Sequence, residues 1–164
     1  MTDLQNLLSQ LPSNTSIGYG GVSIWPFSEL QERQEGYSVS ADGRSLIGKK
    51  DGDWQSNWLA IGSEDLCGDP VFIDTAASGY PAYTAAEGEG RWDAVPIAVS
   101  ITGLRYALEA IRRVATGREN PVAVEENPIS AAEREGVLRE IGEHNPEIDL
   151  SFWSMMLGDE PEED

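Results

Sequence analysis

The sequence predicts an α+β fold in which helices cover one face of an antiparallel β-sheet. Short apolar runs separated by turn residues occupy the segment from Trp58 to Ser100, a pattern typical of β-hairpins. Beyond Ser100, apolar residues recur at helical spacing. With 164 residues, of which 40% are hydrophobic, the chain can form one domain around one core.

The first third of the chain carries shorter signals. Leucines at positions 4, 7, 8 and 11 predict a helix that Pro12 ends. Residues 13–21 are polar and rich in glycine and predict a loop, whereas residues 22–25 alternate like a strand. Two further elements are expected, a short polar helix at residues 29–35 and a strand at residues 37–40.

The hairpin segment begins with two apolar runs, residues 58–62 and 71–75, which flank an acidic turn at residues 63–70. Strand, tight turn and strand in this order predict a hairpin whose connection presents carboxylates to solvent. Further strand patterns follow. Pro81 and Pro96 lie among them, and because proline cannot donate a backbone hydrogen bond, we expect both at edge strands or bulges.

Three helices are expected in the second half of the chain. Apolar residues at 3-4-3-4 spacing form one stripe over residues 101–115. A Ser-x-x-Glu capping box at residues 130–133 begins a second helix that runs to about residue 143. Asp149 can cap a short third helix over residues 150–157.

The chain is strongly acidic, with a formal net charge of −18 and a pI of about 4.2. Such a charge repels nucleic acid and anionic membranes, and it would speed encounter with a basic partner by roughly 10- to 1000-fold at low salt. The sequence contains no run of about 18 apolar residues, so no membrane span is expected. Five carboxylates lie in residues 158–164, which we expect to form a disordered tail.

A series of short motifs runs through the hairpin segment in order. They are Ile-Gly at 61–62, Gly-Asp at 68–69, Phe-Ile-Asp at 72–74, Gly-Tyr-Pro-x-Tyr at 79–83 and Trp-x-x-x-x-Ile-Ala-x-Ser at 92–100. This set resembles the central signature of the SUKH superfamily, which includes fungal Smi/Knr cell-wall regulators and many bacterial immunity proteins. The likeness covers residues 22–115. It implies a single SUKH-like domain over residues 1–157, with residues 116–157 as a helical extension.

The resemblance also implies a function. Bacterial members of the superfamily share a fold and differ in partner. They are typically immunity proteins, which bind the C-terminal domain of a polymorphic or contact-delivered toxin, often one with a basic surface, and neutralise it by direct contact. The alternative within the same superfamily is a non-enzymatic regulatory or scaffolding module of the Smi/Knr type.

Few residues could support catalysis or metal binding. The sequence has one histidine, His144, and one cysteine, Cys67, so neither a tetrahedral zinc site nor a Cys-His pair is expected. An oxygen-ligand site at Asp51, Asp53 and Asn57 lacks the glycine and the final glutamate of a calcium loop. We therefore expect no metal and no cofactor. The single cysteine and an N-terminus without a secretion signal favour a cytoplasmic location.

An enzyme that uses paired carboxylates is a third class of function. The candidate pairs are Asp65 with Asp69 and Glu87 with Glu89. Both pairs lie in glycine-containing loops, where exposure would keep their pKa values near the ordinary range. Such an enzyme requires a pocket with at least one buried acid of raised pKa.

Residues on predicted loops are the candidates for binding a basic partner. Trp54 lies in a polar turn, where it is either an exposed binding anchor or folded back onto the sheet. Edge strands permit a dimer, but nothing in the sequence requires one. The candidate contact residues are Asp51, Asp53, Trp54, Glu64, Asp65, Asp69, Glu87 and Glu89.

Overall fold

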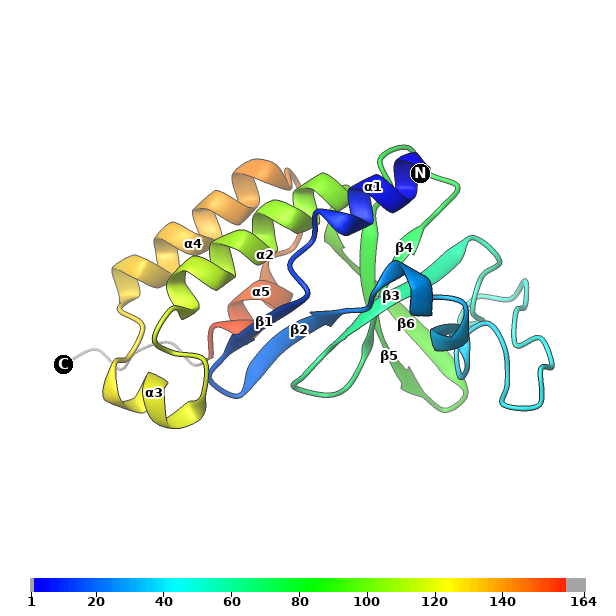
Figure 1. Cartoon of the computed structure of the whole chain (residues 1–164), viewed down its shortest axis with the longest axis horizontal. Coiled ribbons are helices and arrows are strands. Elements are labelled where there is room, and N and C mark those ends of the chain that lie inside the picture. Colours follow the sequence, from blue (N-terminus) through cyan, green and yellow to red (C-terminus); the bar gives the residue numbers. More distant parts are fainter. Residues whose placement is uncertain (1, 159–164) are drawn as a thin grey trace.

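The computed structural model describes residues 2–158 and confirms the α+β class (Figure 1). Six strands form one antiparallel sheet, in which each strand pairs with its neighbours in sequence. The sheet is therefore a meander, and its two edges are β1 and β6. The strands are β1 (Asn14–Ile17), β2 (Gly20–Ile24), β3 (Trp58–Glu64), β4 (Pro70–Asp74), β5 (Ala82–Gly88) and β6 (Arg91–Ala98).

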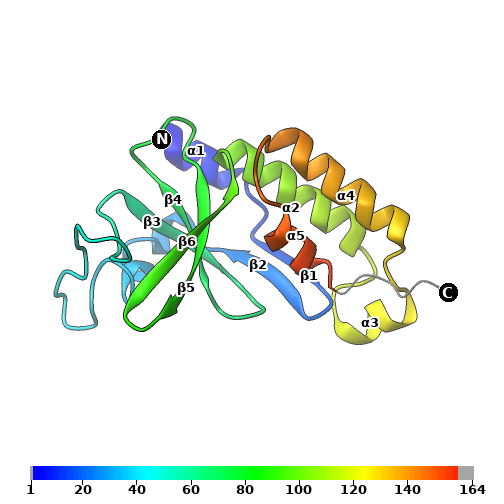
Figure 2. The same cartoon turned by 180° about the vertical axis from the view of Figure 1, so that it is seen from behind.

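Helices cover one face of this sheet, as predicted. Helix α2 (Ile101–Ala115) contacts β1 and β6, and α4 (Ala131–His144) packs on α2 (Figure 2). Helix α5 (Ser151–Met156) is fixed beside the end of β6, because the buried Trp153 donates its Nε1 hydrogen to the carbonyl of Ile97 at 2.9 Å. The remaining helices are α1 (Asp3–Ser9), α3 (Pro121–Glu126) and two 3₁₀ turns, Phe27–Glu29 and Glu32–Gln34.

Alternation along the strands divides the buried side chains between the two faces of the sheet. In β4, Val71 and Ile73 belong to the aliphatic core beneath the helices, while Phe72 lies on the opposite face. That opposite face carries an aromatic cluster, which the connection between β2 and β3, residues 25–57, helps to enclose. The aromatic cluster comprises Tyr37, Trp54, Trp58, Phe72, Tyr83 and Trp92.

The N-terminal part of the chain holds one more strand than the sequence suggests. The predicted helix is confirmed as α1, and the strand over residues 22–25 is confirmed as part of β2. The predicted loop over residues 13–21 is wrong, because residues 14–17 form β1. Every second residue of β1 is buried, but one of the two buried residues is Thr15, so the strand has too little apolar content to be recognised.

The segment after β2 also differs from the prediction. The expected helix over residues 29–35 is only the pair of 3₁₀ turns, and residues 37–40 form none of the six strands. The buried side chain of Gln34 performs part of a strand's role. Its Nε2 donates to the carbonyl of Ala60 at 2.9 Å, and its Oε1 accepts from the Ala60 N–H at 3.0 Å. The Gln34 amide thus supplies hydrogen-bond partners to the backbone of β3, just beyond the point where the pairing of β3 with β2 ends.

The predicted hairpins and the main helices are confirmed. Pro96 lies in the edge strand β6 beside a register shift, and Pro81 immediately precedes β5. The three expected helices are α2, α4 and α5, and the predicted capping box of Ser130 and Glu133 is present. Helix α3 was not predicted, because six residues are too few to show a period. Its local signals are the Asn120 N-cap and a proline at the first helical position.

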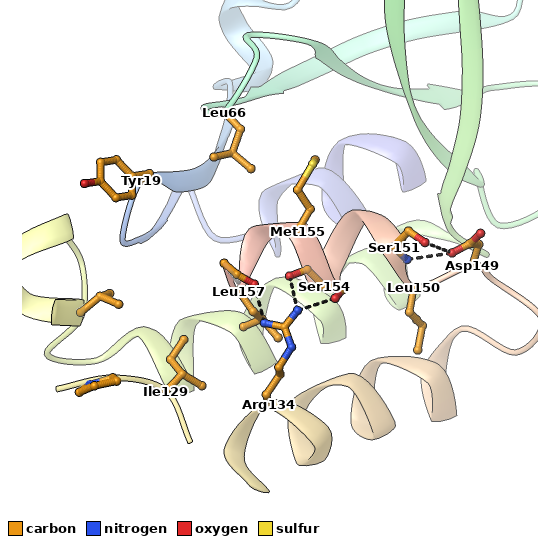
Figure 3. A pocket seen from close by; sticks show the side chains of 13 residues that line it. Tyr19, Leu66, Ile129, Arg134, Asp149, Leu150, Ser151, Ser154, Met155 and Leu157 are labelled. Atoms are coloured by element: carbon orange, nitrogen blue, oxygen red, sulfur yellow. Dashed lines mark hydrogen bonds between the residues drawn. The ribbon is translucent and has the colours of Figure 1, made fainter. Parts of the chain in front are cut away.

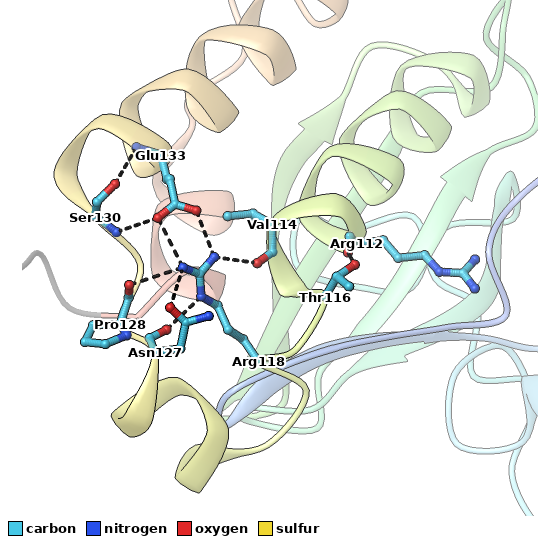
Figure 4. Close-up of polar contacts among 8 residues, drawn as sticks. All are labelled: Arg112, Val114, Thr116, Arg118, Asn127, Pro128, Ser130 and Glu133. Carbon is cyan, nitrogen blue, oxygen red and sulfur yellow. Dashed lines mark hydrogen bonds and ion pairs between the residues drawn. The ribbon is translucent and has the colours of Figure 1, made fainter.

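A buried arginine joins the segments that surround α3 (Figure 4). The guanidinium of Arg118, whose side chain is only 8% exposed, forms two hydrogen bonds with the Glu133 carboxylate, at 2.9 and 3.1 Å. It also donates to three backbone carbonyls, those of Val114, Asn127 and Pro128. One side chain therefore ties the end of α2, the end of α3 and the start of α4 together.

Replacing Gln34 by leucine should lower the free energy of unfolding by about 1–3 kcal/mol, because the buried N–H and carbonyl of Ala60 would lose their partners. Urea denaturation measures this change. The matched control is Gln31→Leu, three residues earlier and exposed, which should change stability by less than about 0.5 kcal/mol. Equal effects of the two substitutions would rule out the role assigned to Gln34.

The ion pair of Glu133 predicts a pH dependence of stability. The hydrogen bonds from Arg118, followed by that from the Ser130 N–H, lower the pKa of Glu133 from 4.5 to about 2. Because the folded-state pKa is depressed, the stabilisation is complete above pH 4.5 and is lost as the pH falls toward 2. The urea midpoint of the wild type should therefore fall more steeply over this range than that of E133Q. Parallel curves, or the same flattening in the exposed control E135Q, would contradict this assignment.

Candidate partner-binding surface

The meander places alternate turns at the same end of the sheet. The β1–β2, β3–β4 and β5–β6 turns all lie along the lower edge of the molecule in Figure 1. Three of the predicted contact residues, Asp65, Asp69 and Glu89, lie in the last two of these turns, and a fourth, Glu87, lies near the end of β5 beside its turn. We call these four carboxylates the acidic end. None of the four is buried.

Asp51 and Asp53 lie elsewhere, in the connection that crosses the aromatic face. The carbonyl of Gly52 accepts a hydrogen bond from the Trp92 N–H at 2.8 Å, which places this loop against the edge of β6. The carboxylate of Asp51 pairs with Arg91 at 3.3 Å.

The surface around this loop is of mixed charge. Lys49, Lys50 and Arg91 line the same shallow depression as Asp51. The carboxylate of Asp53 turns inward and accepts from the Lys50 N–H at 3.1 Å. This loop therefore offers a basic partner less net negative charge than the acidic end does.

The prediction that Trp54 is an exposed binding anchor is wrong, and the alternative that it folds back onto the sheet is confirmed. Its side chain is at the centre of the aromatic cluster, and the residue is 1% exposed. The ring centroids of Phe72 and Tyr37 lie 4.9 and 5.2 Å from that of Trp54. Its Nε1 donates to the carbonyl of Trp58 at 3.3 Å. The polar sequence around Trp54 hides this burial, because Phe72 and Trp92, two of the rings that enclose it, come from distant strands.

Glu64 cannot be a direct contact residue either, because it is 2% exposed. Its carboxylate folds into the β3–β4 turn and accepts backbone N–H groups from Leu66 at 2.8 Å, Cys67 at 3.0 Å and Asp69 at 2.8 Å. One side chain therefore organises the entire turn. Glu64 and Asp65 are adjacent acidic residues, so the sequence alone gives no reason to expect one to be buried and the other exposed. The path of the folded turn decides this difference.

Glu64 also changes the chemistry of the two aspartates beside it. Partial burial, followed by the nearby Glu64 carboxylate, raises the pKa of both Asp65 and Asp69. The expectation that exposure keeps the pKa of these two acids in the ordinary range is therefore wrong, because both are partly buried and both lie near the Glu64 carboxylate. Ionising both aspartates costs energy that a nearby cation would recover.

The β3–β4 turn also holds the one group of potential metal ligands found among residues 2–158. Side-chain atoms of Glu64, Cys67 and Asp69 lie within 4.8 Å of one another. Both oxygens of Glu64 already accept backbone hydrogen bonds, so this carboxylate is committed to the turn. Asn57, a residue of the predicted oxygen-ligand site, has another role. Its side-chain amide donates a hydrogen bond to the Asp74 carboxylate at 2.6 Å and so joins the start of β3 to the end of β4. The ring of His144 stacks on Tyr106.

Comparison with protein families, curated proteins and solved structures finds no match to this chain. The resemblance to the SUKH superfamily therefore stays a prediction. Within residues 2–158, no helix is long and apolar enough to cross a membrane.

The raised pKa of Asp65 predicts that D65N is more stable than the wild type at pH 7. The folded state binds this proton more tightly than the unfolded chain does, so ionisation lowers the free energy of unfolding. The advantage should disappear below about pH 3.8, where the aspartate is protonated in both states. Urea midpoints at pH 7 and pH 3 measure both effects.

The control for this experiment is D93N, which removes the same formal charge from an exposed position on β6. It should produce a smaller difference at pH 7. A D65N midpoint at or below that of the wild type at pH 7 would contradict the raised pKa of Asp65.

Proposed function

We propose that this protein is a cytoplasmic immunity protein, which binds the basic surface of a bacterial toxin domain and neutralises it without catalysis. The observation that carries the proposal is the acidic end, where exposed turns present carboxylates of a chain with net charge −18. The motif resemblance to SUKH immunity proteins supports the same function.

The electrostatics of the β3–β4 turn suit this role. Partial burial, followed by the Glu64 carboxylate that is fixed inside the turn, opposes the ionisation of Asp65 and Asp69. A lysine or arginine from a partner would relieve that repulsion and stabilise the ionised aspartates. Glu64 therefore favours binding through its charge, although its buried side chain makes no direct contact. Long-range attraction would mainly accelerate association, and close pairing would slow dissociation.

Affinity purification from the native cells tests the proposal. The full-length protein carries a tag, and the bound proteins are eluted by high salt, which screens electrostatic contacts. A toxin-like protein whose toxicity disappears on co-expression supports the immunity function. Several unrelated housekeeping partners would instead favour the regulatory module, and either that result or a complete lack of toxin binding would overturn the proposal.

Charge reversal at the acidic end provides a quantitative prediction for the purified toxin. The double variant D65K/D69K should slow association by about tenfold or more at low salt and reduce its salt dependence, because it reverses the steering field. The control E143K makes a charge reversal on the exposed side of α4 and should have a smaller effect. Stopped-flow mixing measures the rates. Equal rates for the wild type and the double variant would exclude the β3–β4 turn from the interface.

A further inference from the structure

A groove with a volume of about 1000 Å³ lies next to the β3–β4 turn (Figure 3). Helix α5 forms one wall, and the opposite side is formed by the β1–β2 turn with Tyr19 and the β3–β4 turn with Leu66. Val124 of α3 and Ile129 also line the groove. The groove thus combines hairpin turns of the sheet with the C-terminal extension, and none of these parts forms it alone.

The groove exposes large apolar side chains. Tyr19 is 80% exposed, Met155 is 49% exposed and Leu66 is 36% exposed, and all three line it. In Figure 3, Met155 rises from α5 toward the turn that carries Leu66. Apolar side chains gathered in one concave surface of an otherwise highly charged protein are typical of an interaction site.

The wall formed by α5 is held in place before any ligand binds. Arg134 of α4 is 7% exposed, and its guanidinium donates to the carbonyl of Gly158 at 2.7 Å and to that of Ser154 at 2.9 Å. The same group donates to the Ser154 hydroxyl at 2.5 Å. These bonds fix the last turn of α5. They also direct the one cationic side chain that lines the groove toward α5, away from an occupant.

The surroundings of the groove are negatively charged. Asp149 lies in its lining, and Asp65 precedes Leu66 in the acidic turn. An apolar occupant that also carries positive charge would match both the apolar lining and these two carboxylates.

We propose that this groove binds an apolar segment of a partner polypeptide, with lysine or arginine residues flanking the apolar side chains. A bulky anchor would lie between Tyr19, Leu66 and Met155, and the flanking cations would approach Asp65 and Asp149. The identification of the partner as a toxin rests on the proposed function. The chemistry of the bound segment rests on the groove.

A phage-displayed library of random peptides, selected on the immobilised full-length protein, tests the chemistry of the occupant. Counter-selection on the double variant L66D/M155D removes sequences that bind elsewhere. The selected peptides should combine bulky apolar residues with lysine or arginine. Enrichment of acidic peptides, or of none that depends on the groove, would overturn the proposal.

The binding of one selected peptide, made synthetically, then locates the site. L66D and M155D should each weaken binding by about tenfold or more, because each places a charge in the apolar lining. The matched control is L46D, which alters a leucine of similar exposure, 41% against 36%, outside the groove. Because the altered side chains are partly exposed, the variants should fold, and thermal unfolding checks this for each one.

The alternative occupants give different results. A fatty alcohol that competes with the peptide in a salt-independent manner would indicate an apolar ligand without charge. A wild-type dimer that L66D dissociates, seen by analytical ultracentrifugation, would assign the groove to a second copy of this chain. Either result overturns the proposal.

Failure of the groove and failure of the immunity function can be told apart. A toxin that binds the wild type and L66D/M155D equally would leave the immunity function standing and exclude the groove. Groove-dependent peptides, combined with no toxin partner in native cells, would retain the groove and exclude the immunity function.

Discussion

Burial of both faces of the sheet is the constraint on which the rest of this structure depends. The strands carry aliphatic residues on one face and large aromatic rings on the other, so neither face can be left in water. Helices α2, α4 and α5 meet the first requirement, and the long connection between β2 and β3 helps to meet the second. Its contribution is partly polar, because the amide of Gln34 pairs with Ala60 where a neighbouring strand would otherwise be needed.

With both faces of the sheet covered, the turns at the ends of the strands are among the parts of the sheet that stay exposed. The β3–β4 turn occupies such an end, and Glu64 gives it a fixed shape through three backbone N–H groups. Arg118 and Arg134 position the C-terminal extension beside that turn through hydrogen bonds to backbone carbonyls. Two buried cations thus support a surface on which the exposed charge is negative.

Regular periodicity and local capping allowed much of the fold to be predicted from the sequence. The β3–β4 hairpin, the helix over residues 101–115 and the capping box at Ser130 all depend on neighbouring residues, and all are confirmed. The burial of Trp54 and Glu64 could not be predicted in this way. Two of the rings around Trp54, those of Phe72 and Trp92, come from distant strands, and the role of Glu64 depends on the path of the turn. The groove escaped prediction for the same reason, because Tyr19, Leu66 and Met155 are far apart in sequence.

The order of the strands in the sheet, which follows their order in the chain, has a consequence for folding. Pairing of β3 through β6 closes only short turns, so its entropic cost is small, whereas pairing of β2 with β3 must close the loop of residues 25–57. The late-forming part of the domain is then the cover over Phe72 and Trp92. A chain that stalls before this closure would display an aromatic sheet face to other stalled chains, and aggregation during synthesis would begin there.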